Sequence, residues 1–327
     1  MRSDDFMNAE DVARYLHLGK NTVYQLAKSG QLASYRVGRK LKFTLEDVES
    51  YVASTHQSSA ATSPLTSAKA SPAGIARDHA ESDLSRAAAF GALEGDPFII
   101  AGGDVAADLI ASALNSLGMS AARLVHGSYT SLVNLYAGEA NAAVVHLYDQ
   151  KTNSYNVPYA TSLAPGVSVV IYRLYGRKQG LIVQEGNPKS LTTWGSLLRE
   201  GVRLSNRTKG SGARVLLDEK LRAMEARSES IEGYDSHASV ASVAIRRVAA
   251  GMADVAIATS REARRVEGVK FIPLQTEWVD LVVTKTPESR PYIRQLSSLL
   301  ASDRFKYDAQ TLGPSDLTKM GSIIYES

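Results

Sequence analysis

The chain has 327 residues, and its 37 lysines and arginines against 34 aspartates and glutamates leave a formal net charge of only +3. This balance excludes a polybasic histone-like protein and an acidic disordered tail, and the length is typical of about two domains. The absence of cysteine excludes disulfides, thiol catalysis and thiolate-bound metal sites. No apolar run reaches the ~20 residues that a membrane helix needs, and no apolar segment follows Met1, so we expect a cytoplasmic protein without a signal peptide.

The chain begins with a pattern that predicts two short helices. Asn8 is placed to cap a helix over residues 9–17. A second helix is expected over residues 22–28, with Asn21 as its cap and Gly30 just after its end. The apolar residues Val12, Leu16, Val23, Leu26, Leu32 and Val48 are expected to form the core of this part.

A hairpin and a third helix are expected next. Two alternating runs, 33–37 and 41–44, are joined by a short basic turn, which favours an antiparallel hairpin. Thr44 followed by Asp47 resembles a capping box that opens a helix to residue 52. The order helix, turn, helix, hairpin, helix predicts a winged helix-turn-helix domain over residues 1–53.

The charge of this domain is concentrated in one stretch. Residues 12–45 hold seven basic residues and no acidic one, which suits contacts with DNA phosphates. An ordinary solvated basic surface is the alternative. The seven basic residues are Arg14, Lys20, Lys28, Arg36, Arg39, Lys40 and Lys42.

Residues 7–52 resemble the excisionase-type helix-turn-helix of the MerR-like group. The resemblance rests on V-Y-x-L-x-K-x-G-x-L from Val23, followed by R-V-G-R-K and the aromatic Phe43. It implies that the second helix enters the major groove of double-stranded DNA, where Gln25 pairs with adenine, and that the hairpin follows the backbone. The DNA-facing residues that it implies are Asn21, Thr22, Tyr24, Gln25 and Lys28 on the helix and Arg36, Arg39, Lys40 and Lys42 on the wing.

A linker separates this domain from the rest of the chain. Residues 54–74 are rich in Ser, Ala, Thr and Pro and lack aromatic residues, so they cannot bury enough surface to offset the entropy of ordering. We expect a flexible linker over residues 54–95, with an ordered surface loop as the alternative, and a helix at 77–93 that would extend the linker or cap the next domain.

Strand-like and helical runs alternate in residues 96–327 and predict a parallel sheet with helices on its faces. Two α/β lobes facing each other across a cleft account for this length, and ligands of such sheets bind at the carboxyl ends of the strands. The expected strands are 98–101, 121–125, 142–146, 253–258 and 280–284, and the expected helices are 105–117, 130–137 and 239–251.

Four polar loops precede expected helices, at 102–104, 127–130, 207–212 and 234–237. Helix N-termini offer unpaired backbone N–H groups, so loops that converge on one cleft would hold a small anion. For any single loop, an ordinary helix cap is the alternative. The spacing of the Gly-rich loop does not match a Walker motif.

The larger part resembles the cytoplasmic periplasmic-binding-protein-like domain related to molybdate-binding proteins. The resemblance rests on N-R-x-x-G-S-G-x-R with L-L-D after it, within residues 205–221, and on the runs 146–159, 177–188, 233–257 and 271–283. It implies a two-lobed type II fold and a regulator that senses molybdate, tungstate or another small oxyanion.

The ligand contacts that we expect in the cleft are Gly103, Asp104, Ser128, Tyr129, Thr130, Arg207, Lys209, Gly210, Ser211, Gly212, Arg214, Ser236 and His237. Asp104 would repel an anion unless it caps its helix or pairs with Arg214 or Lys209. Arg214 has Asp218 four residues on as an alternative partner. His146 is expected in the core, with ligand contact as the alternative. The family's G-S-H-D loop reads A-G-G-D here, and alanine replaces its usual threonine at position 213.

The two parts together predict a ligand-responsive transcriptional regulator, working as a homodimer or higher homo-oligomer on two DNA half-sites. We expect no catalytic residues, no metal, no cofactor other than the effector, and no membrane partner. The alternatives are an excisionase-like architectural DNA-binding protein and a cleft enzyme that acts on a small anionic substrate. The sequence lacks the common hydrolase and dinucleotide motifs.

Overall fold

A computed structural model describes residues 6–16, 23–24, 26–27, 32–37, 40–44, 47–48, 96–313 and 316–327. The predicted linker at 54–95, with its helix at 77–93, lies outside the described residues. The chain divides into two units, residues 1–71 and residues 72–327.

In the first unit, α1 (Ala9–Leu16) begins where the sequence predicts it. The Asn8 Oδ1 atom accepts hydrogen bonds from the backbone N–H groups of Glu10 at 2.8 Å and Asp11 at 3.1 Å. The Asp11 carboxylate in turn accepts from the Asn8 N–H at 3.1 Å. These bonds satisfy donors that the first turn of a helix leaves free, so the predicted cap is confirmed.

The predicted hairpin is also confirmed, as β2 (Tyr35–Val37) and β3 (Lys40–Thr44) pair antiparallel. A strand that we did not predict, β1 (Phe6–Asn8), pairs with the other edge of β3. Three residues are too few to show a period of two, which is why the sequence gives no signal for it. The expected capping box is present as well, since Thr44 and Asp47 each accept the other's backbone N–H.

The first unit has a small core of its own. The predicted core residues Val12, Val23, Leu32 and Val48 are buried, and Leu26 packs against them. Helical backbone is present at 23–24 and 26–27, within the predicted second helix. The buried residues of this core are Ala9, Val12, Ala13, Val23, Leu32, Phe43 and Val48.

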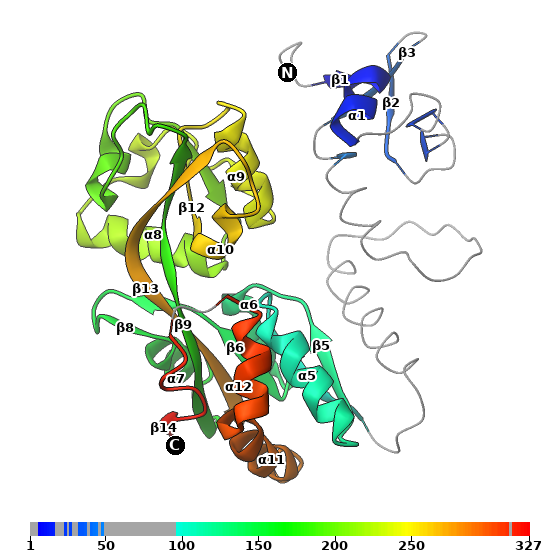
Figure 1. Ribbon diagram of the computed structural model, residues 1–327, viewed down its shortest axis with the longest axis vertical. Helices are drawn as coiled ribbons and strands as arrows, with labels where there is room; N and C mark the ends of the chain where they lie inside the picture. The colour runs from blue at the N-terminus through cyan, green and yellow to red at the C-terminus, as the bar shows by residue number, and fades with distance from the viewer. Residues whose placement is uncertain are drawn as a thin grey trace. The chain divides into compact units, whose positions relative to one another are not determined.

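The second unit is built on one nine-stranded sheet with two long central strands (Figure 1). These strands, β9 (Val169–Gln184) and β13 (Val269–Thr284), pair antiparallel along their lengths. The order is β11-β10-β12-β9-β13-β6-β4-β5, with β14 also on β9. The shorter strands are β4 (Phe98–Ala101), β5 (Ala121–Leu124), β6 (Ala142–Val145), β10 (Leu204–Arg207), β11 (His237–Ala238), β12 (Val255–Thr259) and β14 (Ile323–Glu326).

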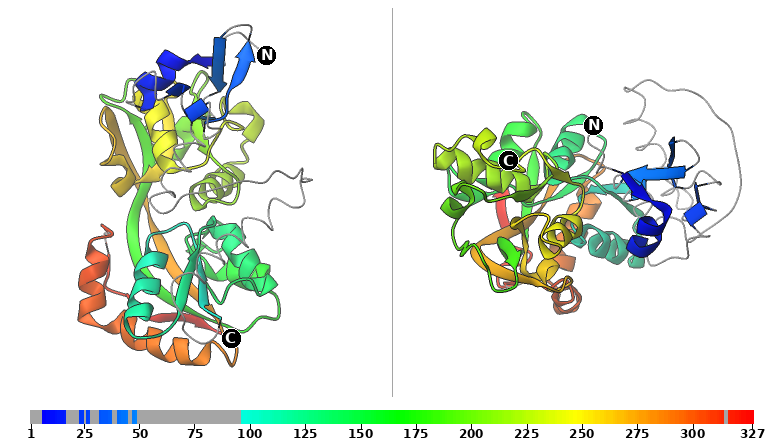
Figure 2. Two further views of the ribbon diagram at one scale, coloured as in Figure 1. Left: turned by 90° about the vertical axis from the view of Figure 1, so that its right-hand side faces the viewer. Right: turned by 90° about the horizontal axis from the view of Figure 1, so that it is seen from above.

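The long strands run through two lobes, which Figure 2 shows in side view. We call residues 96–175 with 279–327 the first lobe, and residues 181–274 the second lobe. Within each lobe the short strands pair parallel, as predicted, while their junctions with β9 and β13 are antiparallel. The expected strand at 280–284 is therefore the end of a much longer one.

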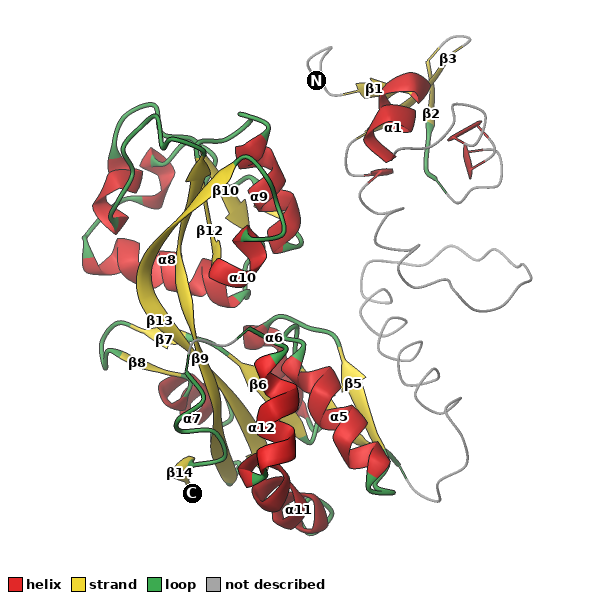
Figure 3. Ribbon diagram, in the orientation of Figure 1, coloured by secondary structure: helices red, strands yellow, loops and turns green. Residues whose placement is uncertain are grey.

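Helices cover the sheet in both lobes (Figure 3). Alternating residues of β9 and β13 enter different apolar clusters, which places packed side chains on both faces of the sheet. The helices are α5 (Ala106–Ser116), α6 (Ser128–Ala137), α7 (Val157–Leu163), α11 (Arg290–Ala301) and α12 (Asp303–Gln310) in the first lobe, and α8 (Gly212–Ala223), α9 (Ala241–Ala249) and α10 (Ser260–Ala263) in the second.

Two short strands, β7 (Tyr148–Asp149) and β8 (Ser154–Tyr155), form a hairpin that connects the lobes. The backbone N–H of Gln150 at its turn donates to the Glu219 carboxylate on α8 at 2.9 Å. The Lys220 ammonium donates to Gln150 Oε1 at 2.9 Å. The hairpin of the first lobe thus binds a helix of the second.

Candidate functional site

A polar cavity of ≈ 130 Å³ lies between the two lobes. Its walls come from strand ends and helix starts of both lobes, and its floor from the middle of the two long strands. Fourteen residues line it, namely Gly103, Asp104, Gly127, Ser128, His146, Arg177, Gln179, Arg207, Ser211, Gly212, Ala213, Thr259, Glu262 and Glu277.

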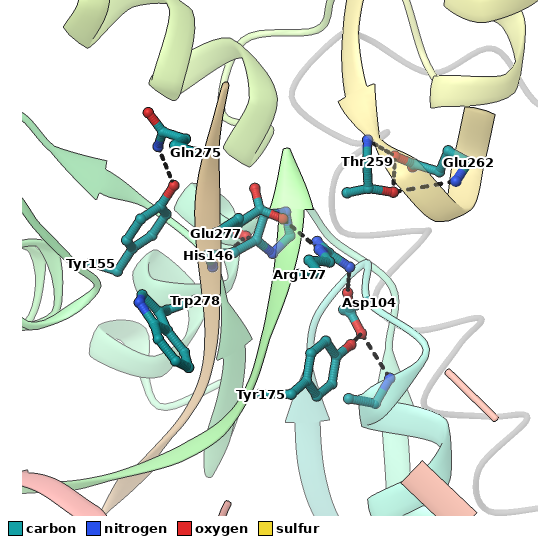
Figure 4. Close-up of polar contacts among 12 residues, drawn as sticks. Asp104, His146, Tyr155, Tyr175, Arg177, Thr259, Glu262, Gln275, Glu277 and Trp278 are labelled. Carbon is teal, nitrogen blue, oxygen red and sulfur yellow. Dashed lines mark hydrogen bonds and ion pairs between the residues drawn. The ribbon is translucent and has the colours of Figure 1, made fainter. Parts of the chain in front are cut away.

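Arg177 on β9 lies between two buried carboxylates (Figure 4). Its Nη1 atom is 2.5 Å from Asp104 Oδ2, and its Nε atom is 2.5 Å from Glu277 Oε2. The side chains of Asp104 and Glu277 are only 3% and 1% exposed. One guanidinium therefore holds two carboxylates that burial would otherwise make costly.

Asp104 is tied to the first lobe by two further hydrogen bonds. The hydroxyl of Tyr175 donates to its Oδ1 atom at 2.5 Å, and the backbone N–H of Ala106 at the start of α5 donates to the same atom at 2.9 Å. Burial acts to raise the pKa of Asp104, but Arg177 and these donors hold that pKa well below its ordinary value. Asp104 is therefore an anion whose oxygens are already paired. The capping role is confirmed, and its basic partner is Arg177 rather than Arg214 or Lys209.

His146 follows β6 and reaches the cavity from the first lobe. Its Nδ1 atom is 3.2 Å from Ser128 Oγ, and its backbone N–H donates to the same oxygen at 3.3 Å. Burial lowers the pKa of His146 more than the nearby Glu277 raises it, so the imidazole is neutral at pH 7. The histidine is half-buried and lines the cavity, so it is not the fully buried core residue that the sequence favoured.

The second lobe supplies the donors of the cavity. Arg207 is held by backbone oxygens, because its Nε donates to Ala238 at 3.2 Å and its Nη2 donates to Ser239 at 3.1 Å. Burial lowers the pKa of Arg207, although Glu262 and Glu277 raise it. No carboxylate of the described residues forms an ion pair with it. Its charge is therefore available to a ligand.

The lobes touch beside the cavity. The backbone N–H of Tyr129, at the start of α6, donates to the Gly210 carbonyl oxygen at 3.1 Å. Gly212, the first residue of α8, packs so closely on His146 that a Cβ there would lie 2.1 Å from the ring carbon Cδ2. The structure thus has its cleft closed.

Six of the predicted ligand contacts line the cavity, namely Gly103, Asp104, Ser128, Arg207, Ser211 and Gly212. They come from three of the four predicted loops. The starts of α6 and α8 lie at the cavity as expected, with Ser211 capping α8 through the Arg214 N–H. Three of the four predicted loops therefore meet at one cavity, and their contact with a ligand stays a prediction.

Other predicted contacts lie elsewhere. Tyr129, Thr130 and Lys209 are exposed and do not line the cavity, and Gly210 makes the contact between the lobes described above. The fourth loop is corrected, because His237 lies in β11 instead of opening a helix and points to solvent. Ser236 is exposed as well and does not line the cavity.

Arg214 also points away from the cavity. Its Nε atom donates to Asp218 Oδ1 at 2.9 Å, and its guanidinium stacks 4.0 Å from the Tyr234 ring centroid. The alternative pairing with Asp218 is thus confirmed, and the expected anion contact is replaced by a structural one. This happens because residue 214 is the third of α8 and faces the body of the second lobe.

Arg177, Gln179 and Glu277 line the cavity but were not predicted as contacts. They lie in the middle of β9 and β13, and no helix cap marks them. The alternation of Arg177 and Gln179, two residues apart on one strand face, is a signal only once β9 is known to cross the cleft.

The predicted DNA contacts are described only in part. Tyr24 lies on helical backbone and is 43% exposed, as a DNA-facing residue should be. Arg36 lies in β2, and Lys40 and Lys42 lie in β3, which places them on the predicted wing. Asn21, Thr22, Gln25, Lys28 and Arg39 lie outside the described residues.

None of the described helices combines the length and the apolar composition needed to span a membrane. Among the same residues, no group of three or more His, Asp or Glu side chains is arranged to hold a metal ion.

Comparison with known families divides the chain as the fold does. The model of the PBP superfamily domain matches residues 111–301, and the model of the helix-turn-helix domain matches residues 6–56. The second match covers the unit that holds α1 and the hairpin. The first covers the long strands and most of both lobes.

Similar proteins are found among curated sequences and solved structures. The uncharacterized protein YvgK of Bacillus subtilis (strain 168) is 34% identical over 320 residues, which are 97% of this chain and 97% of that protein. An uncharacterized protein from the 5′ region of a 2Fe-2S ferredoxin gene of Clostridium pasteurianum is 37% identical over 116 residues, 34% of this chain and 99% of its own length. An H2O2-bound mutant of OxyR from Corynebacterium glutamicum has a TM-score of 0.47 at 14% identity, covering 93% of this chain and 89% of that one.

Proposed function

Because the chain belongs to the PBP superfamily and carries a helix-turn-helix domain, we propose that it is a transcriptional regulator whose DNA binding responds to a small anion in the cleft. One observation carries the proposal, namely that a protein with a helix-turn-helix domain also holds a polar cavity between two lobes. We also propose that the protein works in the cytoplasm, where its DNA lies. An architectural DNA-binding protein would leave this cavity without a role.

The donors of the second lobe support an anion as effector. Arg207 has no carboxylate partner among the described residues, and α8 begins at the cavity with backbone N–H groups free of helical partners. The cavity of ≈ 130 Å³ has room for several water molecules, which suits a tetrahedral oxyanion or a ligand of similar size. Molybdate and tungstate are the candidates that the family resemblance supplies.

We propose that closure of the lobes controls a homodimer in which two winged helices bind two DNA half-sites. An effector shifts DNA affinity only if it binds the open and closed forms with different affinity. The contact between Tyr129 and Gly210 exists only when the lobes meet, so closure supplies two distinct states.

The test of this function measures both binding events on the full-length chain. Thermal-shift screening of molybdate, tungstate, sulfate, phosphate and small carboxylates identifies binders, because stabilisation grows as RT ln(1 + [L]/Kd). Electrophoretic mobility shift on the protein's own promoter region is then repeated with each binder. We expect at least one binder to change the DNA affinity about fivefold or more. Binders that leave the DNA affinity unchanged would contradict the proposal.

The wing gives a second expectation about DNA. Replacing both Arg39 and Lys40 by alanine should weaken DNA binding and reduce the slope of log K against log salt by about two, because each phosphate contact contributes ~0.9. Fluorescence anisotropy over a salt series measures this slope. The matched control replaces Arg304 and Lys306 on α12, whose loss removes the same charge from the other unit. An unchanged slope in the wing variant would remove the hairpin from the DNA interface.

A further inference from the structure

The charge that lines the cavity is not that of a simple anion site. Three carboxylates line it, those of Asp104, Glu262 and Glu277, against the two guanidinium groups of Arg177 and Arg207. With His146 neutral, these residues sum to one negative charge before any ligand binds. An anion without protons would add to this excess in a place where solvent screens poorly.

The positive charge of Arg177 is already engaged by carboxylates of the protein, so it adds little attraction for a ligand. Its Nη1 and Nε atoms are already bound to Asp104 and Glu277. Asp104 is satisfied by Arg177, Tyr175 and the Ala106 N–H, so it presents little to the cavity. Glu262 is also engaged within the protein, because its Oε2 atom accepts hydrogen bonds from the backbone N–H and the hydroxyl of Thr259 in a capping box. Glu277 and Glu262 each keep Oε1 without a hydrogen bond to the described residues, and Glu277 is the more deeply buried of the two.

Two acceptor oxygens of the floor lack donors. Oε2 of Glu277 accepts from Arg177, but among the described residues no donor reaches Oε1 of this 1%-exposed side chain. Gln179 on β9 is also 1% exposed and lines the cavity, and its Oε1 atom has no hydrogen-bond partner in the described part of the chain. An ionised carboxylate only accepts hydrogen bonds, and buried acceptors are rarely left unpaired.

Besides the start of α6 in the first lobe, donors lie across the cavity in the second lobe. Arg207 and the start of α8 at Gly212 offer positive charge and free N–H groups. The cavity thus has a donor wall formed by the second lobe and an acceptor floor formed by Gln179 and Glu277. A ligand that fills it meets both.

We propose that the cleft selects a small anion that also donates a hydrogen bond, and that Glu277 with Gln179 receives that donor. The inference rests on the proposed function and specifies the effector class of the same site. Two sources supply this chemistry, a protonated tetrahedral oxyanion and a small zwitterion whose ammonium faces Glu277. A fully deprotonated oxyanion lacks the donor, and a buried acceptor left unpaired strongly disfavours the ligand that cannot satisfy it.

Four probes with the same number of non-hydrogen atoms separate these cases. Phosphate, which carries a proton near neutral pH, and glycine have donors, whereas sulfate and molybdate have none. We expect isothermal titration calorimetry on the full-length protein at pH 7 to show at least one donor-bearing probe binding about 100-fold or more tightly than both donor-free probes. Whichever of phosphate and glycine binds identifies the source. Tighter binding of sulfate or molybdate, or no binding by any of the four at millimolar concentration, would overturn the proposal.

Glu277→Gln replaces an acceptor on the floor of the cavity by a donor of nearly the same shape. The amide oxygen still accepts from Arg177, while the amide NH₂ faces the cavity as a donor. The variant should lose most of the 100-fold preference, because donor-bearing probes weaken and sulfate or molybdate strengthens. Glu267→Gln, an exposed change of the same kind, is the matched control. A preference unchanged in Glu277→Gln would overturn the role of this residue. If that variant does not fold, the wild-type ranking of the four probes decides the proposal.

Failure of this inference and failure of the proposed function give different results. If sulfate or molybdate binds best and still shifts DNA affinity, the regulator stands and the donor requirement falls. If phosphate or glycine binds with the expected preference but DNA affinity does not change, the effector class stands and the coupling to DNA falls.

Discussion

Gly212→Ala is expected to weaken effector binding about 10- to 100-fold while leaving the fold intact. A Cβ at this position would lie 2.1 Å from His146 Cδ2 and 2.6 Å from the His146 backbone oxygen. Both atoms belong to the first lobe, whereas Gly212 opens α8 in the second. The clash therefore exists only when the lobes are closed. Overpacking costs about 1–3 kcal/mol, and each ~1.4 kcal/mol is a tenfold change in affinity.

The backbone of Gly212 does not itself require glycine, because it is not among the glycines with positive φ. In an open form the alanine would be neutral or stabilising by up to ~1 kcal/mol, since alanine favours a helix more than glycine does. We therefore expect an unchanged or slightly higher Tm without effector and a much smaller effector-induced rise. Differential scanning fluorimetry with a binder from the screen measures both.

The control for this variant is Gly195→Ala. A Cβ at Gly195 would meet only Thr193 Oγ1, at 3.8 Å, and its φ is also ordinary. This change should leave both the Tm and the effector response as in the wild type. If Gly212→Ala bound the effector with wild-type affinity, binding would not need the contact between Gly212 and His146. Closure of the cleft would then have no role in effector binding.

The order of elements in each unit follows from local sequence. Asn8 and the Thr44–Asp47 pair announce helix starts because their side chains can reach only nearby backbone N–H groups. The strand at 98–101 is apolar throughout because both faces of its sheet are covered. In these places the interactions that form the helix or strand lie within one short stretch of chain, so the sequence alone predicts the element.

The long strands could not be predicted in the same way. β9 and β13 are apolar at each end, where they enter the lobe cores, and polar near residues 177 and 277, where they cross the cleft. Their polar middle parts have no strand pattern of their own. Pairing with each other keeps them extended there, and this depends on residues about 100 positions apart.

The same cause limits the site prediction. Ser128 and Ser211 were found because helix starts carry a local signature, and His237 was misplaced because the same signature can precede a short strand. Arg177 and Glu277 have no signature, since each is defined by a partner that only the fold brings near. The helix starts that line the cleft were thus predictable, whereas its acceptor floor was not.

Arg177→Met is expected to lower the free energy of unfolding of the second unit by about 3–5 kcal/mol, which is the usual cost of leaving buried carboxylates without their cation. The guanidinium is the basic partner of both Asp104 and Glu277, whose side chains are 3% and 1% exposed. For a unit of this size the loss corresponds to a fall in Tm of roughly 10 °C. Urea unfolding followed by circular dichroism measures the free energy directly.

The loss of unfolding free energy in Arg177→Met, relative to the wild type, should become smaller as the pH falls. In the wild type the pKa of Asp104 is held low, so its contribution is complete above the unfolded pKa and is lost only in strong acid. Without Arg177, burial dominates and raises the folded pKa of the Asp104 carboxyl above the unfolded value. A buried carboxyl of this kind destabilises the folded state more and more as the pH rises through its folded pKa. The unfolding free energy of the variant should therefore be closer to that of the wild type at pH 5 than at pH 8.

Two companion variants separate the missing charge from lost packing. Adding Asp104→Asn and Glu277→Gln to Arg177→Met removes the unpaired charges and should recover most of the stability and abolish the pH dependence of the deficit. Lys178→Met is the matched control, because Lys178 is the exposed next residue of β9 and its ammonium donates to the Thr276 hydroxyl on β13. If Arg177→Met were as stable as Lys178→Met at pH 8, Asp104 and Glu277 could not both be charged in the folded protein, and the negative floor on which effector selection rests would be lost.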